Sequence, residues 1–162
     1  MLLEVGMQAP QWTAQVEGGE SLALSLEQNS LSSSQLTGTP YVIYFYPKDS
    51  TPGCTTQACD FRDRLEVFKS LGYLVIGVSP DSMKSHGRFR EKQALTFPLI
   101  SDDERVVSEA FGVWQEKKNY GRTYMGVVRS TFVVDANGVI THAQYNVRAK
   151  GHVERLYDLL SS

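Results

Sequence analysis

The chain has 162 residues, of which 41% are hydrophobic and 21% are charged, and its formal net charge is -2 at pH 7. This length and composition predict one soluble globular domain over residues 1–162, with enough material for a sizeable core. The nearly balanced charge gives no reason to expect nucleic acid or an anionic membrane as a partner. No apolar run approaches the roughly 20 residues that span a bilayer.

The residues from Met1 to Pro10 do not combine a basic start with an apolar stretch, so they do not resemble a secretory signal. The cytoplasm is therefore the expected compartment, or an organelle if a transit peptide has been removed. The chain contains two cysteines, which are too few for the disulfide scaffold of a secreted domain.

The first half of the chain is expected to contain strands that lead into a helix. A short strand at Ser21–Leu26 is followed by a serine-rich loop over residues 28–35. The uninterrupted β-prone run Tyr41–Tyr46 is typical of a central strand that is covered on both faces. Apolar residues spaced by four and three from Phe61 to Phe68 predict a helix that begins near Thr51.

The second half is predicted to continue the alternation and to end in a hairpin and a helix. The expected elements are a strand at Tyr73–Ser79, a helix at Asp81–Gln93, a strand at Leu99–Ile100, a helix at Asp102–Phe111, an irregular segment at Gly112–Gly126, strands at Val127–Val134 and Val139–Val147, and a helix at Gly151–Leu160. Strand–helix–strand units predict parallel crossovers, whereas the final hairpin adds antiparallel pairing. The expected fold class is therefore α/β, with a central mixed β-sheet flanked by helices.

The most informative segment is YPKDSTPGCTTQAC, which contains both cysteines and directly follows the predicted central strand. Thr51 is expected to be the N-cap of the helix, with Pro52 in its first position and Cys54 in its third. A cysteine at a helix N-terminus faces unpaired N–H groups and the positive end of the helix dipole, and both favour the reactive thiolate. Gly53 leaves little bulk beside the sulfur atom.

A thiol in this position is compatible with several kinds of site. Two inert core thiols are the plainest interpretation of a cysteine pair. A metal site would need further ligands, and the histidines show no ligand-like spacing to each other or to the cysteines; they are His86, His142 and His152. Disulfide exchange of the thioredoxin type normally uses Cys-x-x-Cys, and acyl transfer needs a histidine partner. Attack on a peroxide needs no general base once the sulfur is ionised, but it needs hydrogen-bond donors and a fixed cation.

At this point the sequence resembles a known family. The pattern Pro47-x-x-x-Thr51-x-x-Cys54 is similar to the signature of the peroxiredoxins, and YFYPKDSTPGCTTQACDFRD resembles their peroxiredoxin Q branch, also called bacterioferritin comigratory protein. The segment from Trp114 to Phe132 and the run Lys150-Gly151-His152 also fit that branch. The resemblance covers nearly the whole chain. It implies a thioredoxin-like fold with an N-terminal β-hairpin extension.

The resemblance also implies roles for individual residues. Cys54 would be the peroxidatic cysteine, which peroxide oxidises to a sulfenic acid. Thr51 would donate its hydroxyl to the peroxide or the sulfur, and Pro47 would shield the sulfur from water. Arg129 would hold the thiolate and the peroxide oxygens, and Gln57 could orient Arg129. The charges of Lys48 and Asp49 are expected to be solvated loop charges, as no catalytic role is implied for them.

Cys59 matches the resolving cysteine of the branch, and its presence implies an intramolecular Cys54–Cys59 disulfide. On an intact helix their Cα atoms would be about 8.6 Å apart, whereas a disulfide requires less than about 7 Å. The helix from Thr51 to about Asp60 is therefore expected to unwind in each catalytic cycle. The resemblance implies thioredoxin or a similar dithiol as the reductant, hydrogen peroxide and organic hydroperoxides as substrates, a monomer, and no flavin, haem or metal.

Two other functions remain open at the level of the sequence. A thiol–disulfide oxidoreductase could exchange Cys54 and Cys59 with protein disulfides, although the spacing of these cysteines disfavours it. A redox-sensing binding module would react with peroxide only slowly and would change its partner binding on oxidation.

Overall fold

The computed structural model describes residues 2–162, which form a central sheet, a separate two-stranded ribbon and five α-helices. The strands are β1 (Thr13–Glu17), β2 (Ser30–Ser32), β3 (Tyr41–Phe45), β4 (Leu74–Ser79), β5 (Leu99–Ser101), β6 (Trp114–Asn119), β7 (Arg122–Val127), β8 (Ser130–Val134) and β9 (Ile140–Gln144). The α-helices are α1 (Pro52–Asp63), α2 (Leu65–Ser70), α3 (Met83–Gln93), α4 (Val106–Ala110) and α5 (His152–Ser161).

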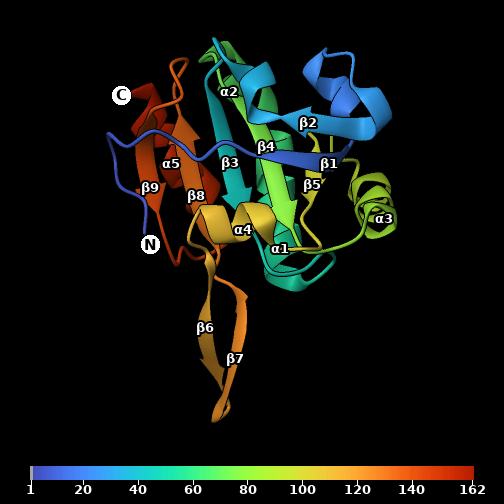
Figure 1. The fold of residues 1–162 in the computed structure, drawn as a ribbon, viewed down its shortest axis with the longest axis vertical. Helices are drawn as coiled ribbons and strands as arrows, with labels where there is room; N and C mark the ends of the chain where they lie inside the picture. Colours follow the sequence, from blue (N-terminus) through green and yellow to red (C-terminus); the bar gives the residue numbers. More distant parts are fainter. Residues whose placement is uncertain (1) are drawn as a thin grey trace.

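The central sheet has the strand order β2-β1-β5-β4-β3-β8-β9 (Figure 1). The pairs β3–β4 and β4–β5 are parallel, whereas β8 is antiparallel to both β3 and β9. This mixed α/β sheet confirms the predicted fold class. It also places the end of β3 directly beside the start of β8, because Phe45 pairs with Ser130.

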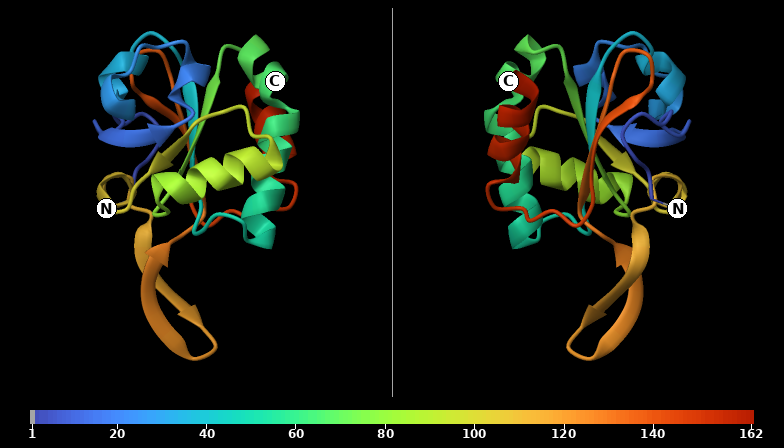
Figure 2. Two further views of the ribbon diagram at one scale, coloured as in Figure 1. Left: turned by 90° about the vertical axis from the view of Figure 1, so that its right-hand side faces the viewer. Right: turned by 90° about the vertical axis from the view of Figure 1, so that its left-hand side faces the viewer.

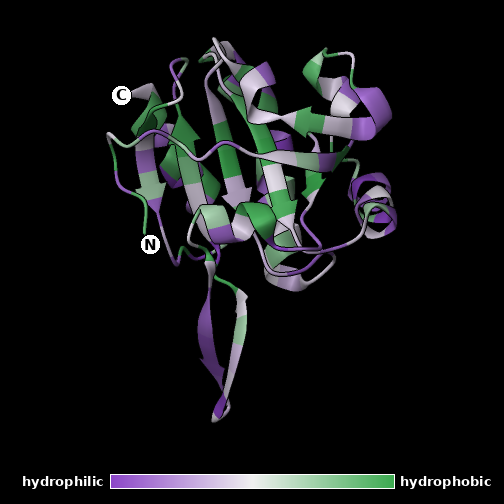
Figure 3. Cartoon of the chain, in the orientation of Figure 1, coloured by the Kyte–Doolittle hydropathy of each residue, from purple (hydrophilic) through white to green (hydrophobic). Residues whose placement is uncertain are grey.

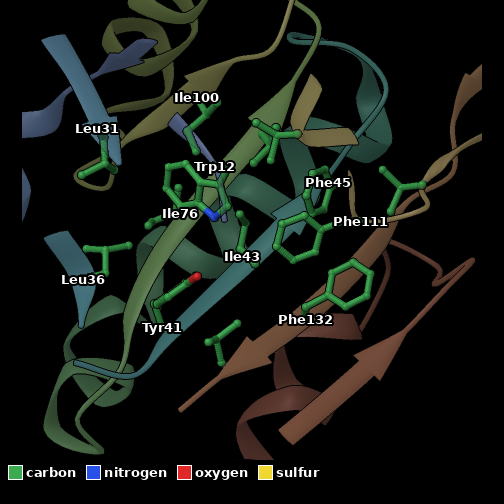
Figure 4. Packing of buried hydrophobic residues seen from close by; sticks show 14 of the residues in the cluster. Trp12, Leu31, Leu36, Tyr41, Ile43, Phe45, Ile76, Ile100, Phe111 and Phe132 are labelled. Carbon is green, nitrogen blue, oxygen red and sulfur yellow. The ribbon is translucent and has the colours of Figure 1, made fainter. Parts of the chain in front are cut away.

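The sheet is covered on both faces, as the side views show (Figure 2). Side chains of β3 alternate between two cores, which explains its uninterrupted apolar sequence. Ile43 and Phe45 belong to a core with Trp12, Phe111 and Phe132 (Figure 4). The alternate β3 residues, Val42 and Tyr44, point to the opposite core, which is built with helices α1, α2, α3 and α5. Its members also include Phe61, Phe68, Phe89, Val153 and Leu156.

The N-terminal prediction was partly wrong. A 3-10 helix at Gly19–Leu22 overlaps the start of the strand expected at Ser21–Leu26, and Gly18 and Ala23 on either side of this helix adopt left-handed backbone conformations. The strand β2 lies instead within the predicted serine-rich loop. The expected N-terminal hairpin corresponds to the antiparallel pair β1–β2, and β1 also pairs with β5, so this pair is part of the main sheet.

The irregular segment expected at Gly112–Gly126 is mostly a β-ribbon. Strands β6 and β7 pair antiparallel along their whole lengths and project from the body of the molecule (Figure 1). Tyr120 and Gly121 at the tip have positive φ values of 51° and 76°, the conformation of a tight hairpin turn. The ribbon carries charged residues rather than alternating apolar ones, and much of it is hydrophilic in Figure 3. Its sequence therefore lacks the usual signal of a half-buried strand.

The predicted helices are present, with bounds that are shorter, divided or, for α5, shifted by one residue. The helix from Thr51 is interrupted at Arg64, which separates α1 from α2. The helix expected at Asp102–Phe111 covers Val106–Ala110, and the Asp102 carboxylate accepts hydrogen bonds from the N–H groups of Val107 and Ser108. None of the helices among residues 2–162 combines the length and apolarity that a membrane span requires.

Candidate active site

The two cysteines lie on α1, immediately after β3. Pro52 is the first residue of this helix and Thr51 is its N-cap, as predicted. Cys54 follows in the first turn, where the residue is 2% exposed and packs in the core beneath the helix. Both cysteines are free thiols in this structure. The site therefore presents a buried sulfur at the positive end of a twelve-residue helix.

Arg129 supplies a fixed cation at this sulfur. Its Nη2 donates a hydrogen bond of 3.2 Å to Sγ of Cys54. The backbone of Arg129 is held in place because its carbonyl accepts a 2.9 Å bond from the N–H of Val147. Gly53 allows the close approach, since a Cβ at that position would lie 3.3 Å from the guanidinium nitrogen. The guanidinium remains charged at any ordinary pH, so it can stabilise a thiolate throughout.

Gln57 orients the same guanidinium. Its Oε1 accepts a 2.6 Å hydrogen bond from Nη1 of Arg129, and its side chain is fully buried one turn beyond Cys54. The sequence could only suggest this contact by resemblance. Within residues 2–162, the Nε2 of Gln57 is a buried donor without a protein partner.

Thr51 and Pro47 lie on the loop between β3 and α1, which leads into the helix that carries Cys54. The hydroxyl of Thr51 donates a 2.9 Å hydrogen bond to the carbonyl of Lys48, and no side-chain bond caps the helix. Thr51 is thus the N-cap by its position, while its hydroxyl closes the preceding turn instead of bonding to the helix. Its expected contact with a peroxide stays a prediction.

A groove of about 530 Å³ lies beside Arg129. Pro47 and Arg129 line it together with Lys117 from β6 and Val147 from the segment after β9. The ammonium of Lys117 donates a 2.9 Å hydrogen bond to the Val127 carbonyl. Burial lowers the pKa of Lys117, and the charge of Arg129 lowers it further, whereas a negative charge on Cys54 opposes both effects. Strand β6 thus forms one wall of this groove, which the prediction of an irregular segment missed.

Cys59 lies on the same helix but is held by different neighbours. It is half-buried, and its thiol donates a 3.5 Å hydrogen bond to Oε1 of Gln93 at the end of α3. The Nη1 of Arg62 donates a 2.6 Å bond to the carbonyl of Gln93. Because α1 is continuous from Pro52 to Asp63, the two sulfurs cannot bond without local unwinding.

Asp49 is not the solvated charge that was expected. The residue is 5% exposed, and its carboxylate accepts hydrogen bonds from Tyr46, Ser85 and His86. Burial alone would raise the pKa of Asp49, but these bonds and the charge of His86 hold it below its ordinary value. The error arose because Asp49 sits between polar residues in sequence, and its partners on α3 are more than thirty positions away. His86 is a fully buried histidine whose two ring nitrogens both have hydrogen-bond partners.

Comparison with known proteins agrees with this geometry. The model of the AhpC/TSA family matches residues 5–143. Peroxiredoxin Bcp of Bacillus subtilis is 47% identical over 153 residues, which cover 94% of this chain and 92% of that protein. A PrxQ variant from Xylella fastidiosa superimposes with a TM-score of 0.88 at 33% identity, covering 99% of this chain and 97% of the other. The bacterioferritin comigratory protein of Xanthomonas campestris, a structure described in terms of alkyl peroxide reduction, gives a TM-score of 0.82 at 37% identity, with 93% and 90% covered.

Proposed function

The chain belongs to the AhpC/TSA family, as a thiol-dependent peroxidase of its Bcp/PrxQ branch, and we propose that Cys54 is the residue that attacks the peroxide. The observation that carries this assignment is the hydrogen bond from Arg129 to a sulfur at the start of α1. The thiolate of Cys54 forms a bond to one peroxide oxygen while the O–O bond breaks. The other oxygen leaves as hydroxide or alkoxide and takes up a proton, and Cys54 becomes a sulfenic acid.

In this proposal the surrounding residues stabilise charge rather than exchange protons. Arg129 holds the thiolate before the reaction and stabilises the negative charge that develops on the leaving oxygen. Gln57 fixes the guanidinium plane through its 2.6 Å hydrogen bond. Pro47 shields the sulfur from bulk water, and Thr51 donates its hydroxyl to the peroxide after giving up its bond to Lys48.

We assign Cys59 the role of resolving cysteine. Its thiol attacks the sulfenic sulfur of Cys54, a disulfide forms, and the sulfenic oxygen leaves as water. The contact with Gln93 must break for this step, together with several hydrogen bonds of α1. Since both sulfurs come from one helix of one chain, a monomer can complete the cycle.

A dithiol then reduces the disulfide by two successive exchange reactions. Thioredoxin or a similar protein is the proposed reductant, as the family resemblance implies. The groove beside Arg129 is large enough for an organic substituent. This space and the alkyl peroxide activity described for the Xanthomonas campestris relative support organic hydroperoxides as substrates besides hydrogen peroxide.

Stopped-flow peroxide reduction by two serine variants tests these assignments. Cys54→Ser should consume no peroxide. Cys59→Ser should complete a single turnover and accumulate sulfenic acid, but it should fail to recycle with thioredoxin. Mass spectrometry of the oxidised wild type should show a Cys54–Cys59 bond. An active Cys54→Ser variant beside an inactive Cys59→Ser variant would mean that the two roles are reversed.

Measurements on the wild-type protein separate the alternative functions. A thiol–disulfide oxidoreductase would reduce a disulfide reporter without peroxide. A redox-sensing module would react with peroxide at about the rate of free cysteine and would change its partner binding on oxidation. Either result in the wild-type protein would replace the peroxidase mechanism proposed for Cys54.

A further inference from the structure

A buried polar cluster lies beside the loop that carries the peroxidatic site, at the carboxyl ends of β3, β4 and β5. Asp49 follows β3, Asp81 follows β4, and His86 lies in the first turn of α3. Tyr46 donates a 2.6 Å hydrogen bond to Oδ1 of Asp49, and Ser85 donates a 2.8 Å bond to Oδ2. The roles proposed so far make no use of this cluster.

His86 is the central donor of the cluster. Its side chain is fully buried, with Nδ1 2.7 Å from Oδ2 of Asp49 and Nε2 2.9 Å from the carbonyl of Ile100. A carbonyl oxygen only accepts, so Nε2 carries a hydrogen. The contact between Nδ1 and the carboxylate then also contains a proton, which makes it a charge-assisted hydrogen bond within a buried pair.

The cluster does not have the geometry of a metal site. Asp49, Asp81 and His86 offer ligand atoms that lie within 4.8 Å of one another. However, the 2.7 Å between Nδ1 and Oδ2 is a hydrogen-bond distance, whereas two ligands of a tetrahedral zinc ion would be roughly 3.3 Å apart. The carboxylate of Asp81 is already hydrogen-bonded as well, since its Oδ2 accepts bonds from the Ser79 hydroxyl and the Asp49 N–H.

We propose that the Asp49–His86 pair is a positioning clamp for the peroxide-binding loop, residues 47–51. This inference rests on the proposed function of Cys54. The clamp ties the loop to α3 through the Asp49 side chain, and the bond from the Asp49 N–H to Asp81 adds a second tie, of 2.8 Å. Pro47 and Thr51, the two loop residues assigned a role at the sulfur in the proposed function, lie two positions on either side of Asp49.

The backbone of the loop explains why a clamp is needed. Ser50, between Asp49 and Thr51, has a φ of 63°, a left-handed conformation that is unfavourable for a residue with a side chain. Two sets of hydrogen bonds hold Ser50 in this conformation. The buried bonds of Asp49 lie on one side of it, and the bond from Thr51 to Lys48 lies on the other. Without the clamp, the loop would relax, and Pro47 and Thr51 would move relative to the sulfur. Arg129 comes from a different segment, so the thiolate would keep its cation.

Loss of the clamp should therefore slow the reaction of Cys54 with peroxide but not its alkylation. Asp49→Asn and His86→Phe should slow oxidation of Cys54 by hydrogen peroxide about 10- to 100-fold, the scale of an ångström-sized misplacement at a reacting centre. Alkylation of Cys54 by iodoacetamide at the same pH should stay close to the wild-type rate, because it needs the thiolate but not the loop. His86→Asn keeps a neutral donor near the position of Nδ1 and should recover part of the peroxide rate. His142→Asn, on β9, is the matched control and should behave as wild type.

Both rates would be measured on reduced full-length protein below its unfolding temperature, with the product at Cys54 identified by mass spectrometry. Wild-type peroxide rates in the folded variants would overturn the clamp. An equal fall in the peroxide and alkylation rates would also overturn it, because the pair would then act on the thiolate or the fold. If His86→Phe does not fold, Asp49→Asn and His86→Asn decide the outcome. A wild-type protein no faster than free cysteine would contradict the proposed function instead.

Discussion

Arg129 Nη2 lies 3.2 Å from the sulfur of Cys54, although the two residues are 75 positions apart in the chain. The sheet produces this contact. Phe45 at the end of β3 pairs with Ser130 at the start of β8, so Arg129 precedes β8 at the same edge where the loop to Cys54 leaves β3. The pairing of β3 with β8 thus places the backbone of Arg129 beside the loop that leads to Cys54.

Replacing Arg129 should therefore lower peroxide reactivity strongly. Arg129→Met is expected to reduce the rate of Cys54 oxidation by about 10²-fold or more, the usual cost of removing one preorganised donor from a site of developing charge. Arg129→Lys should recover only part of this rate, because an ammonium cannot contact both Gln57 and the sulfur in the same fork-like geometry. Stopped-flow oxidation by hydrogen peroxide measures both, with Arg122→Met on the exposed ribbon as the control. Equal rates for Arg129→Met and wild type would contradict this role.

Gln57 should act through Arg129. Gln57→Leu leaves Nη1 of the guanidinium without its 2.6 Å acceptor, so we expect peroxide oxidation to slow by about 10-fold. Gln57→Glu keeps an acceptor and should be faster than Gln57→Leu. Thr56→Ala, an exposed position on the same helix, is the control. If Gln57→Leu and Gln57→Glu have the same rate, the hydrogen bond to Arg129 does not matter for catalysis.

Oxidation should unwind part of α1. The intact helix keeps the two Cα atoms about 8.6 Å apart, and the disulfide brings them within about 7 Å. Amide hydrogen exchange over residues 52–62 should therefore become faster in the oxidised protein than in the reduced one. Strand β3, fully buried in the same core layers, should keep its protection in both states. Equal protection of residues 52–62 in the two states would count against the unwinding step.

The buried His152 predicts a pH dependence of stability. Burial lowers its pKa to about 4, with further lowering by the charges of Arg155 and Arg129, and its Nε2 lies 2.9 Å from the Thr131 hydroxyl. The unfolded chain binds a proton at this residue near pH 6.5, whereas the folded chain does so only near pH 4. The contribution of neutral His152 to the free energy of unfolding is therefore fully present above about pH 6.5 and is lost as the pH falls towards about 4.

Urea unfolding at about pH 7.5 and about pH 5 measures this effect. His152 should account for a loss of about 2 kcal/mol in the free energy of unfolding between these two conditions. The variant His152→Gln should lack this part of the pH dependence, and His142→Gln should retain it. Indistinguishable pH profiles for His152→Gln and wild type would show that His152 does not titrate in this way.

Local sequence patterns predicted the elements that have a local cause. The run Tyr41–Tyr46 indicated a strand buried on both faces, and the structure has β3 between two cores. The Thr-Pro start of α1 predicted a helix N-terminus with Cys54 in its first turn. The ribbon β6–β7 was missed because most of it extends away from the core, so its strands carry no alternation of apolar and polar residues.

By itself, the sequence determined a mixed α/β sheet, a reactive thiol at the start of a helix, and a second thiol too far along that helix to bond without unwinding. These features depend on periodicity and on spacing between near neighbours, which the order of residues records directly. Only the tertiary structure decided which distant side chains surround that thiol. The contact of Arg129 with Cys54 follows from the pairing of β3 with β8, and the burial of Asp49 follows from the packing of α3 against the loop. The residues around a charged side chain in the sequence can be the same whether it lies in solvent or in a buried pair, so only the fold distinguishes these two environments.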